Sequence, residues 1–198
     1  MVGFFSGTPR DGHGHHQVSG LLAREAYDLA ADTVRFPVAG YGLPWTPLKF
    51  YRSARQNPAE ATLRMNVGEY DALLGRSYFE IAAESRSQHK SQGFGVLQRK
   101  GAIMDAITRE AARTGPADAA AERSIFDGVD TTWARVRAKL PVAARGTLDS
   151  ALTLFAEARA QYRADDPSPI VTTLARGMQL LRRVQTAAGA TPGVLLSG

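Results

Sequence analysis

The sequence predicts an α/β protein that is mostly helical, with a small sheet near the N-terminus and a helical extension after it. Three observations lead to this fold class. Short apolar or alternating runs at residues 2–6, 48–52 and 62–67 are typical of strands. Apolar residues at helical spacing fill residues 17–31, between the first two of these runs. From residue 102 onward, only helical patterns occur.

The first predicted strand, Val2 to Ser6, is a short apolar run that stops at Gly7-Thr8-Pro9. A strand there needs a neighbouring strand to satisfy its backbone groups. A loop leads to the first helix, whose apolar residues are Val18, Leu21, Leu22, Ala26 and Leu29. Residues 36–47 are rich in Gly and Pro, and they predict a loop before the second strand.

The character of the chain changes after Gly75. Residues 76–92 predict a helix that stops at Gly93 and Gly95. Further helices are predicted around residues 103–111, 131–140, 148–162 and 170–187, and the tail from Gly189 is expected to fray. We therefore divide the chain into a first domain at residues 1–100 and a helical extension at residues 101–198.

Composition narrows the possible functions only a little. The chain has 198 residues, of which 44% are hydrophobic and 22% charged, and a net charge of +5. It contains no cysteine, which excludes disulfides and thiolate metal sites. No apolar run is long enough for a membrane span, and the basic residues are scattered without a recognition motif for nucleic acid. No targeting signal is present, so the compartment stays open.

Three of the four histidines, His13, His15 and His16, fall within four positions. The cluster follows a predicted strand and precedes a helix, and sites in open α/β sheets lie beyond the carboxyl ends of strands. Neutral imidazole is a good zinc ligand, and the positive end of a helix dipole disfavours the imidazolium form. An Asp nearby can orient an imidazole through its second nitrogen. The residues alone leave open whether His13 or His16 binds metal while the other faces substrate, and a surface turn or an adventitious metal binder is the alternative.

Residues 6–17, Ser-Gly-Thr-Pro-Arg-Asp-Gly-His-Gly-His-His-Gln, resemble the second metal motif of the PIG-L-type (LmbE-like) zinc-dependent deacetylases. That motif is commonly His-Pro-Asp-His and comes late in a Rossmann-like domain. The resemblance implies that His16 is a zinc ligand. It also implies that His13 is catalytic, protonating the leaving amine or stabilising the oxyanion.

The match departs from the family at one position. His15 stands where the family usually has Asp, so the usual support for His13 is missing. Asp11 is the candidate to replace that support. Arg10 lies next to the motif and is a candidate to contact a hydroxyl or anionic group of the substrate, although a solvated arginine is the simpler interpretation.

A second match lies in residues 85–92, where His89-Lys90-Ser91-Gln92 fits a helical His-x-Ser-Gln segment of the same family. For His89 itself, a packing or capping role is favoured over metal ligation. Residues 68–78 resemble a long bacterial subgroup with extra C-terminal regions. The resemblance covers residues 1–100, where it implies a partial Rossmann-like sheet, and the remainder only loosely.

The first metal motif of the family, Ala-His-Pro-Asp-Asp-Glu, is absent. That motif supplies two zinc ligands and the general base that activates water. The resemblance therefore implies a C-terminal fragment of a metal-dependent amide hydrolase that deacetylates N-acetylglucosamine conjugates. Zinc is the implied cofactor, and the N-terminal half of the deacetylase domain is the missing partner. We expect little or no activity from this chain alone.

Two other functions are compatible with the sequence. One is a non-catalytic helical interaction or scaffold domain, favoured by the helical patterns after residue 102. The other is a basic nucleic-acid binder, which the net charge of +5 permits. No aromatic stacking platform supports the second, so we expect no nucleic-acid partner.

Overall fold

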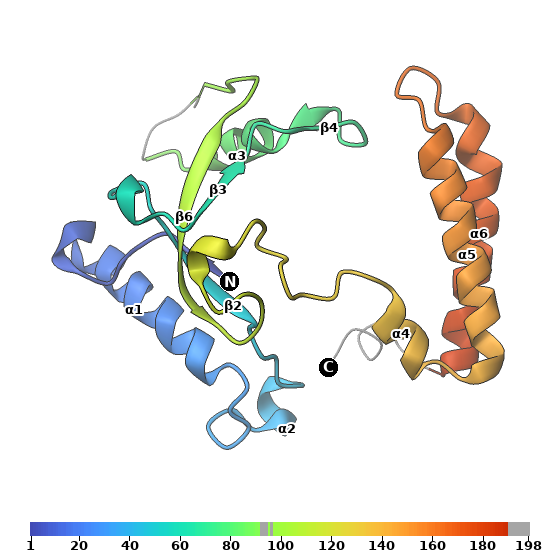
Figure 1. The fold of residues 1–198 in the computed structure, drawn as a ribbon, viewed down its shortest axis with the longest axis horizontal. Helices are drawn as coiled ribbons and strands as arrows, with labels where there is room; N and C mark the ends of the chain where they lie inside the picture. The colour runs from blue at the N-terminus through green and yellow to red at the C-terminus, as the bar shows by residue number, and fades with distance from the viewer. Residues whose placement is uncertain (92–94, 96, 190–198) are drawn as a thin grey trace. The chain divides into compact units, whose positions relative to one another are not determined.

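The computed structural model describes residues 1–91, 95 and 97–189 and combines helices with a small mixed sheet (Figure 1). This confirms the mixed α/β class. The chain divides into two compact units, Met1–Val129 and Asp130–Gly198. The first unit thus includes residues 101–129, which the sequence prediction assigned to the helical extension.

The first unit contains all the strands of the described residues. They are β1 (Val2–Gly3), β2 (Lys49–Ser53), β3 (Leu63–Asn66), β4 (Tyr70–Asp71), β5 (Arg76–Ser77) and β6 (Met104–Ala112). Its helices are α1 (Gly14–Leu29), α2 (Val38–Tyr41) and α3 (Tyr78–Arg86). The predicted strands near residues 2, 48 and 62 and the helix near residue 17 are confirmed, while the short α2 lies inside the predicted loop.

The main sheet has the strand order β1-β2-β6-β3. Strand β1 pairs with β2 in parallel, with Val2 opposite Tyr51, which supplies the neighbour that a strand at this position needs. Strand β6 is antiparallel to both β2 and β3, and a register shift interrupts its pairing with β2 between Phe50 and Tyr51. Strands β4 and β5 form a separate antiparallel pair.

The prediction of a helix at residues 103–111 is wrong, because this segment forms β6. The spacing of Ile103, Ile107 and Ala111 fits a helix, but the neighbouring residues Ala106 and Ile107 are both buried. Two consecutive buried residues are expected of a central strand that is covered on both faces. The pairing partners β2 and β3, which lie far away in the sequence, decide the conformation over the local pattern.

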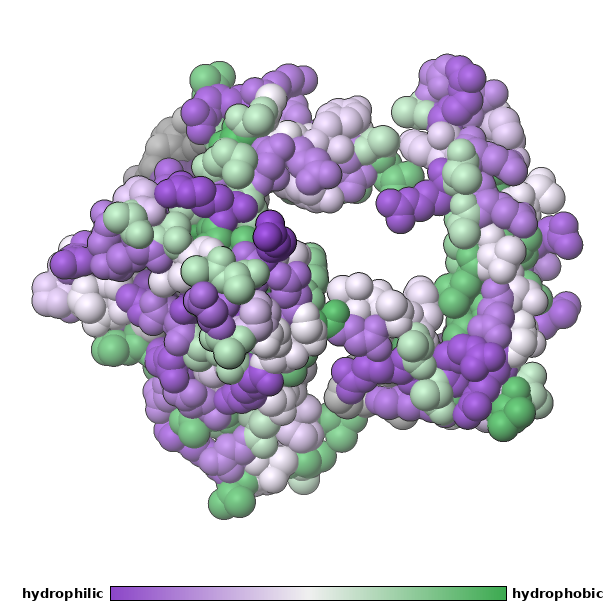
Figure 2. Space-filling view, viewed as in Figure 1, coloured by the Kyte–Doolittle hydropathy of each residue, from purple (hydrophilic) through white to green (hydrophobic). Residues whose placement is uncertain are grey.

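Side chains alternate across β2 and build a core on each face of the sheet. On one face, the Phe50 ring stacks with Tyr27 of α1, with ring centroids 5.9 Å apart, so α1 packs on this face. On the other face, Tyr51 joins Leu63 and Ile107 in a buried cluster that Ile125 covers in part. Polar and apolar residues are interspersed over the surface of this unit in the view of Figure 2.

Helix α3 begins one residue after Ser77 because Ser77 and Glu80 cap each other. The Ser77 hydroxyl oxygen accepts a hydrogen bond from the Glu80 amide, and a Glu80 carboxylate oxygen accepts one from the Ser77 amide. The helix predicted at residues 76–92 is therefore confirmed in part, because α3 starts two residues later and already ends at Arg86, with Ser87 as its C-cap. Residues 92 and 93, where it was expected to stop, lie outside the described residues.

The second unit is helical and has its own core. Its helices are α4 (Ala134–Lys139), α5 (Val142–Gln161) and α6 (Val171–Ala188). Their shared buried cluster consists of Leu140, Ala144, Leu148 and Val184. Gly177 of α6 lies so close to the Phe155 ring that an added Cβ would lie 2.7 Å from it. The tail after Gly189 lies outside the described residues. Within the described ranges, no helix has both the length and the apolarity that crossing a bilayer requires.

Candidate functional site

The Asp11 carboxylate organises the loop between β1 and α1 from within. It accepts hydrogen bonds from the backbone amides of Ser6 (2.9 Å), Gly7 (2.6 Å) and Thr8 (3.2 Å). The residue is only 7% exposed, at the end of a short 3-10 turn that brings the side chain back over the loop. The path of the chain out of β1 is therefore fixed by local hydrogen bonds.

These three amides stabilise the negative charge of the Asp11 carboxylate. Burial by itself raises the pKa of the Asp11 carboxyl, but the hydrogen bonds from Ser6, Gly7 and Thr8 outweigh it and hold the pKa below its usual range. The carboxylate thus serves the loop and not His13, which the sequence had suggested it supports. The Asp11 atom that contacts a histidine is its backbone oxygen.

The imidazole of His16 is held by three neighbours. Its Nδ1 lies 3.0 Å from the backbone oxygen of Asp11. Its ring stacks on Phe5, with centroids 3.9 Å apart, and lies beside the His13 ring at 3.8 Å. In the tautomer that donates from Nδ1 to the carbonyl, the lone pair of Nε2 is free. This is the arrangement in which metal-binding histidines are commonly oriented.

His13 and His15 are more open than His16. His13 occupies the N-cap position of α1, and its carbonyl accepts the amide hydrogen of His16 at 3.1 Å. Its imidazole makes no capping hydrogen bond and is exposed. His15 is also exposed and meets the His13 ring edge-on, with centroids 5.8 Å apart. The three imidazoles therefore gather at the start of α1, where a solute can reach two of them.

Helix α1 lies against the loop with no room for a side chain between them. A Cβ added to Gly20 would lie 2.2 Å from the Gly7 nitrogen and 2.7 Å from the Gly7 Cα. Gly7 itself has φ 78°, a conformation that favours glycine. This close approach of backbone to backbone seats the helix, and with it the histidines, on the loop after β1.

The remaining predicted residues lie apart from these contacts. Arg10 is exposed at the tip of the loop. His89 lies just past the end of α3, where its Nδ1 is 3.3 Å from the Arg86 backbone oxygen. That contact is of the capping kind that the sequence favoured for this residue. Gln92, the last residue of the second family match, lies outside the described residues.

The histidines alone do not make a complete metal centre. Among the residues that the structure describes, no three His, Cys, Asp or Glu side chains are placed to hold a metal ion together. A catalytic zinc commonly has three protein ligands. The donor set around His16 therefore fits part of a zinc site and does not fit a whole one.

A pocket of about 250 Å³ opens beyond the carboxyl ends of the parallel strands β1 and β2. Its lining comes from the loop after β1 and from the end of β2: Phe4, Ser6, Asp11, Arg52, Ser53, Arg55 and Gln56. Open α/β sheets place their ligands in this position. Sequence reasoning missed the two arginines, although a polar run directly after a predicted strand was the signal that could have found them.

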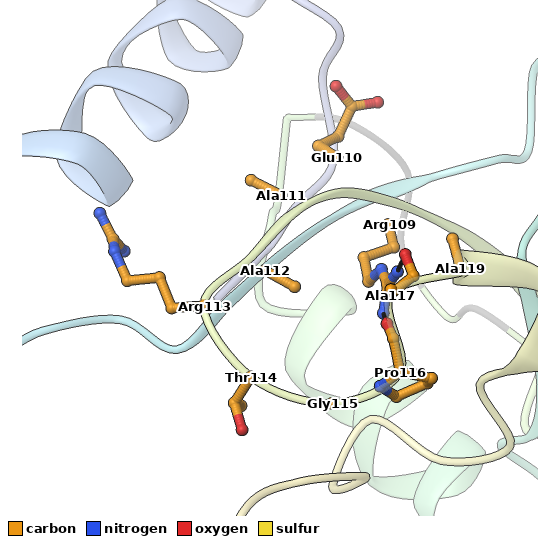
Figure 3. Close-up of a pocket in the computed structure, with 10 residues that line it drawn as sticks. All are labelled: Arg109, Glu110, Ala111, Ala112, Arg113, Thr114, Gly115, Pro116, Ala117 and Ala119. Atoms are coloured by element: carbon orange, nitrogen blue, oxygen red, sulfur yellow. Dashed lines mark hydrogen bonds between the residues drawn. The ribbon is translucent and has the colours of Figure 1, made fainter.

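A second pocket, of about 430 Å³, lies at the end of β6 and the turn that follows it (Figure 3). Arg109 folds against this turn and donates hydrogen bonds to the backbone oxygens of Pro116 (2.7 Å) and Ala117 (2.9 Å). Glu110 and Arg113 point away from the turn in the same view. Because the guanidinium of Arg109 is already bonded to the turn, it helps to hold the turn in place.

Lys49, Arg109 and Glu122 form a buried charge cluster beneath this turn. The Lys49 Nζ lies 2.6 Å from Glu122 Oε1, and the two side chains are 3% and 0% exposed. Arg109 Nη1 lies 3.6 Å from the same oxygen. The hydroxyl of Tyr51 and Oε2 of Glu122 are buried, and neither makes a well-formed hydrogen bond with a residue that the structure describes. Burial raises the pKa of Tyr51 well above its usual range, and the neighbouring Glu122 carboxylate adds to the rise.

No protein-family model, curated protein or solved structure matches this chain.

Proposed function

We propose that the first unit is the C-terminal part of a zinc-dependent deacetylase of the PIG-L type, acting on the acetyl group of N-acetylglucosamine conjugates. In this proposal His16 is a zinc ligand and His13 acts on the reacting group. The observation that carries it is the contact between His16 Nδ1 and the Asp11 backbone oxygen, which leaves Nε2 available to a metal. A surface imidazole without function needs no such support.

The arrangement of the first elements supports the Rossmann-like part of the proposal. Strands β1 and β2 are parallel neighbours joined through α1, and the histidines lie in the loop that leaves the first of them. Ligand sites in this kind of sheet lie beyond the carboxyl ends of the strands. The close contact between Gly7 and Gly20 keeps α1 directly over that loop.

His13 fits the role of a proton donor better than that of a second ligand. Its imidazole is exposed and lies beside His16, with ring centroids 3.8 Å apart. An imidazole there can protonate a departing amine or donate a hydrogen bond to a tetrahedral oxyanion. His15 and Arg10, also exposed, are proposed to contact the substrate.

The proposal requires zinc ligands and a general base that this chain does not supply. The motif Ala-His-Pro-Asp-Asp-Glu does not occur in the 198 residues, and the described side chains do not complete a zinc centre. We propose that the other ligands and the general base come from the N-terminal half of a deacetylase domain. The chain alone should then bind zinc weakly and turn over little or no substrate.

Zinc titration by calorimetry tests the ligand role. We expect weak binding by the unmodified chain, loss of that binding in His16→Ala, and no change in the matched control His89→Ala. Equal zinc affinity in the unmodified chain and in His16→Ala would remove the basis of the proposal. An assay on N-acetylglucosaminyl substrates tests the missing part, since rapid turnover by this chain alone would show that the first motif is dispensable.

For the second unit, we propose a different function, that of a non-catalytic helical interaction or scaffold domain. Helices α5 and α6 share a core formed within Asp130–Gly198, as expected of a helical interaction or scaffold module. This function is tested by producing residues 130–198 alone. A cooperative thermal transition of this fragment would support it, as would binding of a partner by the full chain that His13→Ala and His16→Ala do not affect.

A further inference from the structure

Arg55 carries a guanidinium in the pocket beyond β1 and β2 that pairs with no carboxylate of the described residues. Its Cζ lies 5.9 Å from the centre of the Phe4 ring, and its backbone amide donates to the Ser53 hydroxyl at 3.4 Å. The aromatic face steadies the side chain without neutralising its charge. The cation is therefore exposed beside the pocket, where an anion from solution can reach it.

The other charged groups of the pocket are already matched. Arg52 forms an ion pair with Glu110. The carboxylate of Asp11 accepts hydrogen bonds from three loop amides, which direct it into the loop. Among the lining residues that the structure describes, Arg55 is thus the charged residue whose side chain has no ion-pair partner and can bind an anion from solution.

Neutral hydroxyl and amide groups line the pocket together with Arg55. The hydroxyls of Ser6 and Ser53 and the amide of Gln56 line the same pocket. The Ser53 oxygen accepts the Arg55 amide hydrogen, so its own hydrogen is free to donate to a ligand. The Ser6 hydroxyl is already engaged within the loop, because it contacts the Thr8 hydroxyl at 2.7 Å and its oxygen accepts the Thr8 amide hydrogen at 3.2 Å.

We infer that this pocket binds a phosphate group, either as inorganic phosphate or as the terminal phosphate of a small phosphorylated compound. A guanidinium fork with hydroxyl and amide donors matches the acceptor oxygens of such a group. The volume of about 250 Å³ suits one such group and is too small for a large conjugate. This site requires neither zinc nor deacetylation, so it goes beyond the proposed function.

The test is a titration of the full chain with inorganic phosphate, followed by calorimetry or by amide chemical shifts, without zinc and at constant ionic strength. We expect saturable binding that is weakened about tenfold or more in Arg55→Gln, because a charge-assisted contact is lost. Arg55→Lys should retain part of the affinity, since it keeps the charge but not the fork. Arg176→Gln is the matched control, since it removes the same charge from an exposed site on α6 that has no part in the proposed function.

Two results would overturn the inference. One is the absence of saturable phosphate binding by the unmodified chain. The other is an equal loss of affinity in Arg55→Gln and Arg176→Gln, which would reveal a diffuse attraction to the positive chain. Neither result bears on zinc binding by His16, so this inference and the proposed function can fail separately.

A comparison of ligands identifies the source of the phosphate. If inorganic phosphate and N-acetylglucosamine 1-phosphate bind equally, the site takes the free anion. If the sugar phosphate binds more tightly and Arg55→Gln removes the difference, the site takes a phosphorylated sugar. Uncharged N-acetylglucosamine should not compete with phosphate for the pocket, and competition by it would count against the inference.

Discussion

The histidine loop and the buried charge cluster handle polar groups in opposite ways. In the loop, the Asp11 carboxylate is bonded to amides three to five residues away, and the imidazoles beside it reach solvent. In the cluster, Lys49 pairs with Glu122 across 73 residues of sequence, with both side chains buried. Local hydrogen bonds thus shape a loop whose imidazoles are exposed to solvent. In the cluster, a long-range ion pair buries the charged side chains of Lys49 and Glu122.

This difference in exposure indicates which polar residues can bind a ligand and which ones stabilise the fold. A buried ion pair loses the hydration of both partners, and it is stable only while each partner keeps the other. An exposed imidazole keeps its hydration and remains free to bind a ligand. The loop is therefore the region for which we propose a function, and we regard Lys49, Arg109 and Glu122 as the contacts that hold the turn after β6 on the sheet.

The largest effect is expected from breaking the buried pair. Lys49→Met leaves Glu122 without its closest cation, and we expect a loss of about 3–5 kcal/mol in the free energy of unfolding, measured by urea denaturation. Replacing both partners, Lys49→Met with Glu122→Leu, should recover much of that loss because no uncompensated carboxylate remains.

The exposed pair of Arg24 and Asp28 provides the control for that experiment. Arg24→Gln removes an ion pair at 3.1 Å between side chains that are about half exposed, and it should cost less than about 1 kcal/mol. If Lys49→Met were as mild as Arg24→Gln, the contrast between the two regions would fail.

The next largest effect is expected at the seat of α1. Gly20→Ala places a Cβ 2.2 Å from the Gly7 nitrogen, so the helix has to move away from the loop, at a cost of about 1–3 kcal/mol. Zinc binding should weaken with it, because His16 moves with the helix. Gly14→Ala is the control in the same helix, since an added Cβ there meets nothing within 4 Å. Equal stability of the two variants would contradict the close packing.

A smaller effect with a distinct pH dependence is expected at Asp11. Its pKa is lower in the folded chain than in the unfolded one, so its contribution to stability is present at neutral pH and is lost as the pH falls below about 4. In Asp11→Asn we expect a melting temperature roughly 3–6 °C lower at pH 7 and a smaller further decrease on acidification. Thermal scans at pH 7 and pH 3 measure both. Identical acid sensitivity in variant and unmodified chain would show that the loop amides do not stabilise the charge.

The smallest effect at neutral pH is expected from Tyr51→Phe. The hydroxyl makes no well-formed hydrogen bond with a described residue, so its removal should change the free energy of unfolding by less than about 1 kcal/mol. The pKa of Tyr51 is higher in the folded chain, so its contribution to stability is present below about pH 10 and is lost at higher pH. The variant should therefore tolerate alkaline pH better than the unmodified chain, and Tyr41→Phe, at an exposed position, should not.

Local patterns in the sequence predicted the elements whose contacts are local. The apolar spacing from Val18 to Leu29 gave α1, and the alternation around Leu63 gave β3. Strand β6 was missed because its conformation depends on β2 and β3, which pair with it from about 40 to 60 residues away. The hairpin of β4 and β5 was missed as well, since two-residue strands leave almost no periodic signal.

The same distinction applies to the candidate site. The histidines were found because three of a rare residue lie together in the sequence, and the structure gathers their rings. The support for His16 was not found, since it comes from a backbone oxygen that any residue at position 11 could provide. The pocket beyond β1 and β2 was missed because its lining comes from two segments far apart in the sequence, the loop near residue 6 and the strand end near residue 53.

The central place of β6 determines when the sheet can form. Strands β2 and β3 do not pair with each other, and each depends on a strand that is made some 40 or more residues later. During synthesis, the histidine loop therefore leaves the ribosome well before the sheet that supports it can close. A chain shortened to residues 1–100 would keep every proposed ligand and lose the strand that joins the two halves of the sheet. In this protein, the histidine motif and the strand that completes its supporting sheet lie far apart in the sequence.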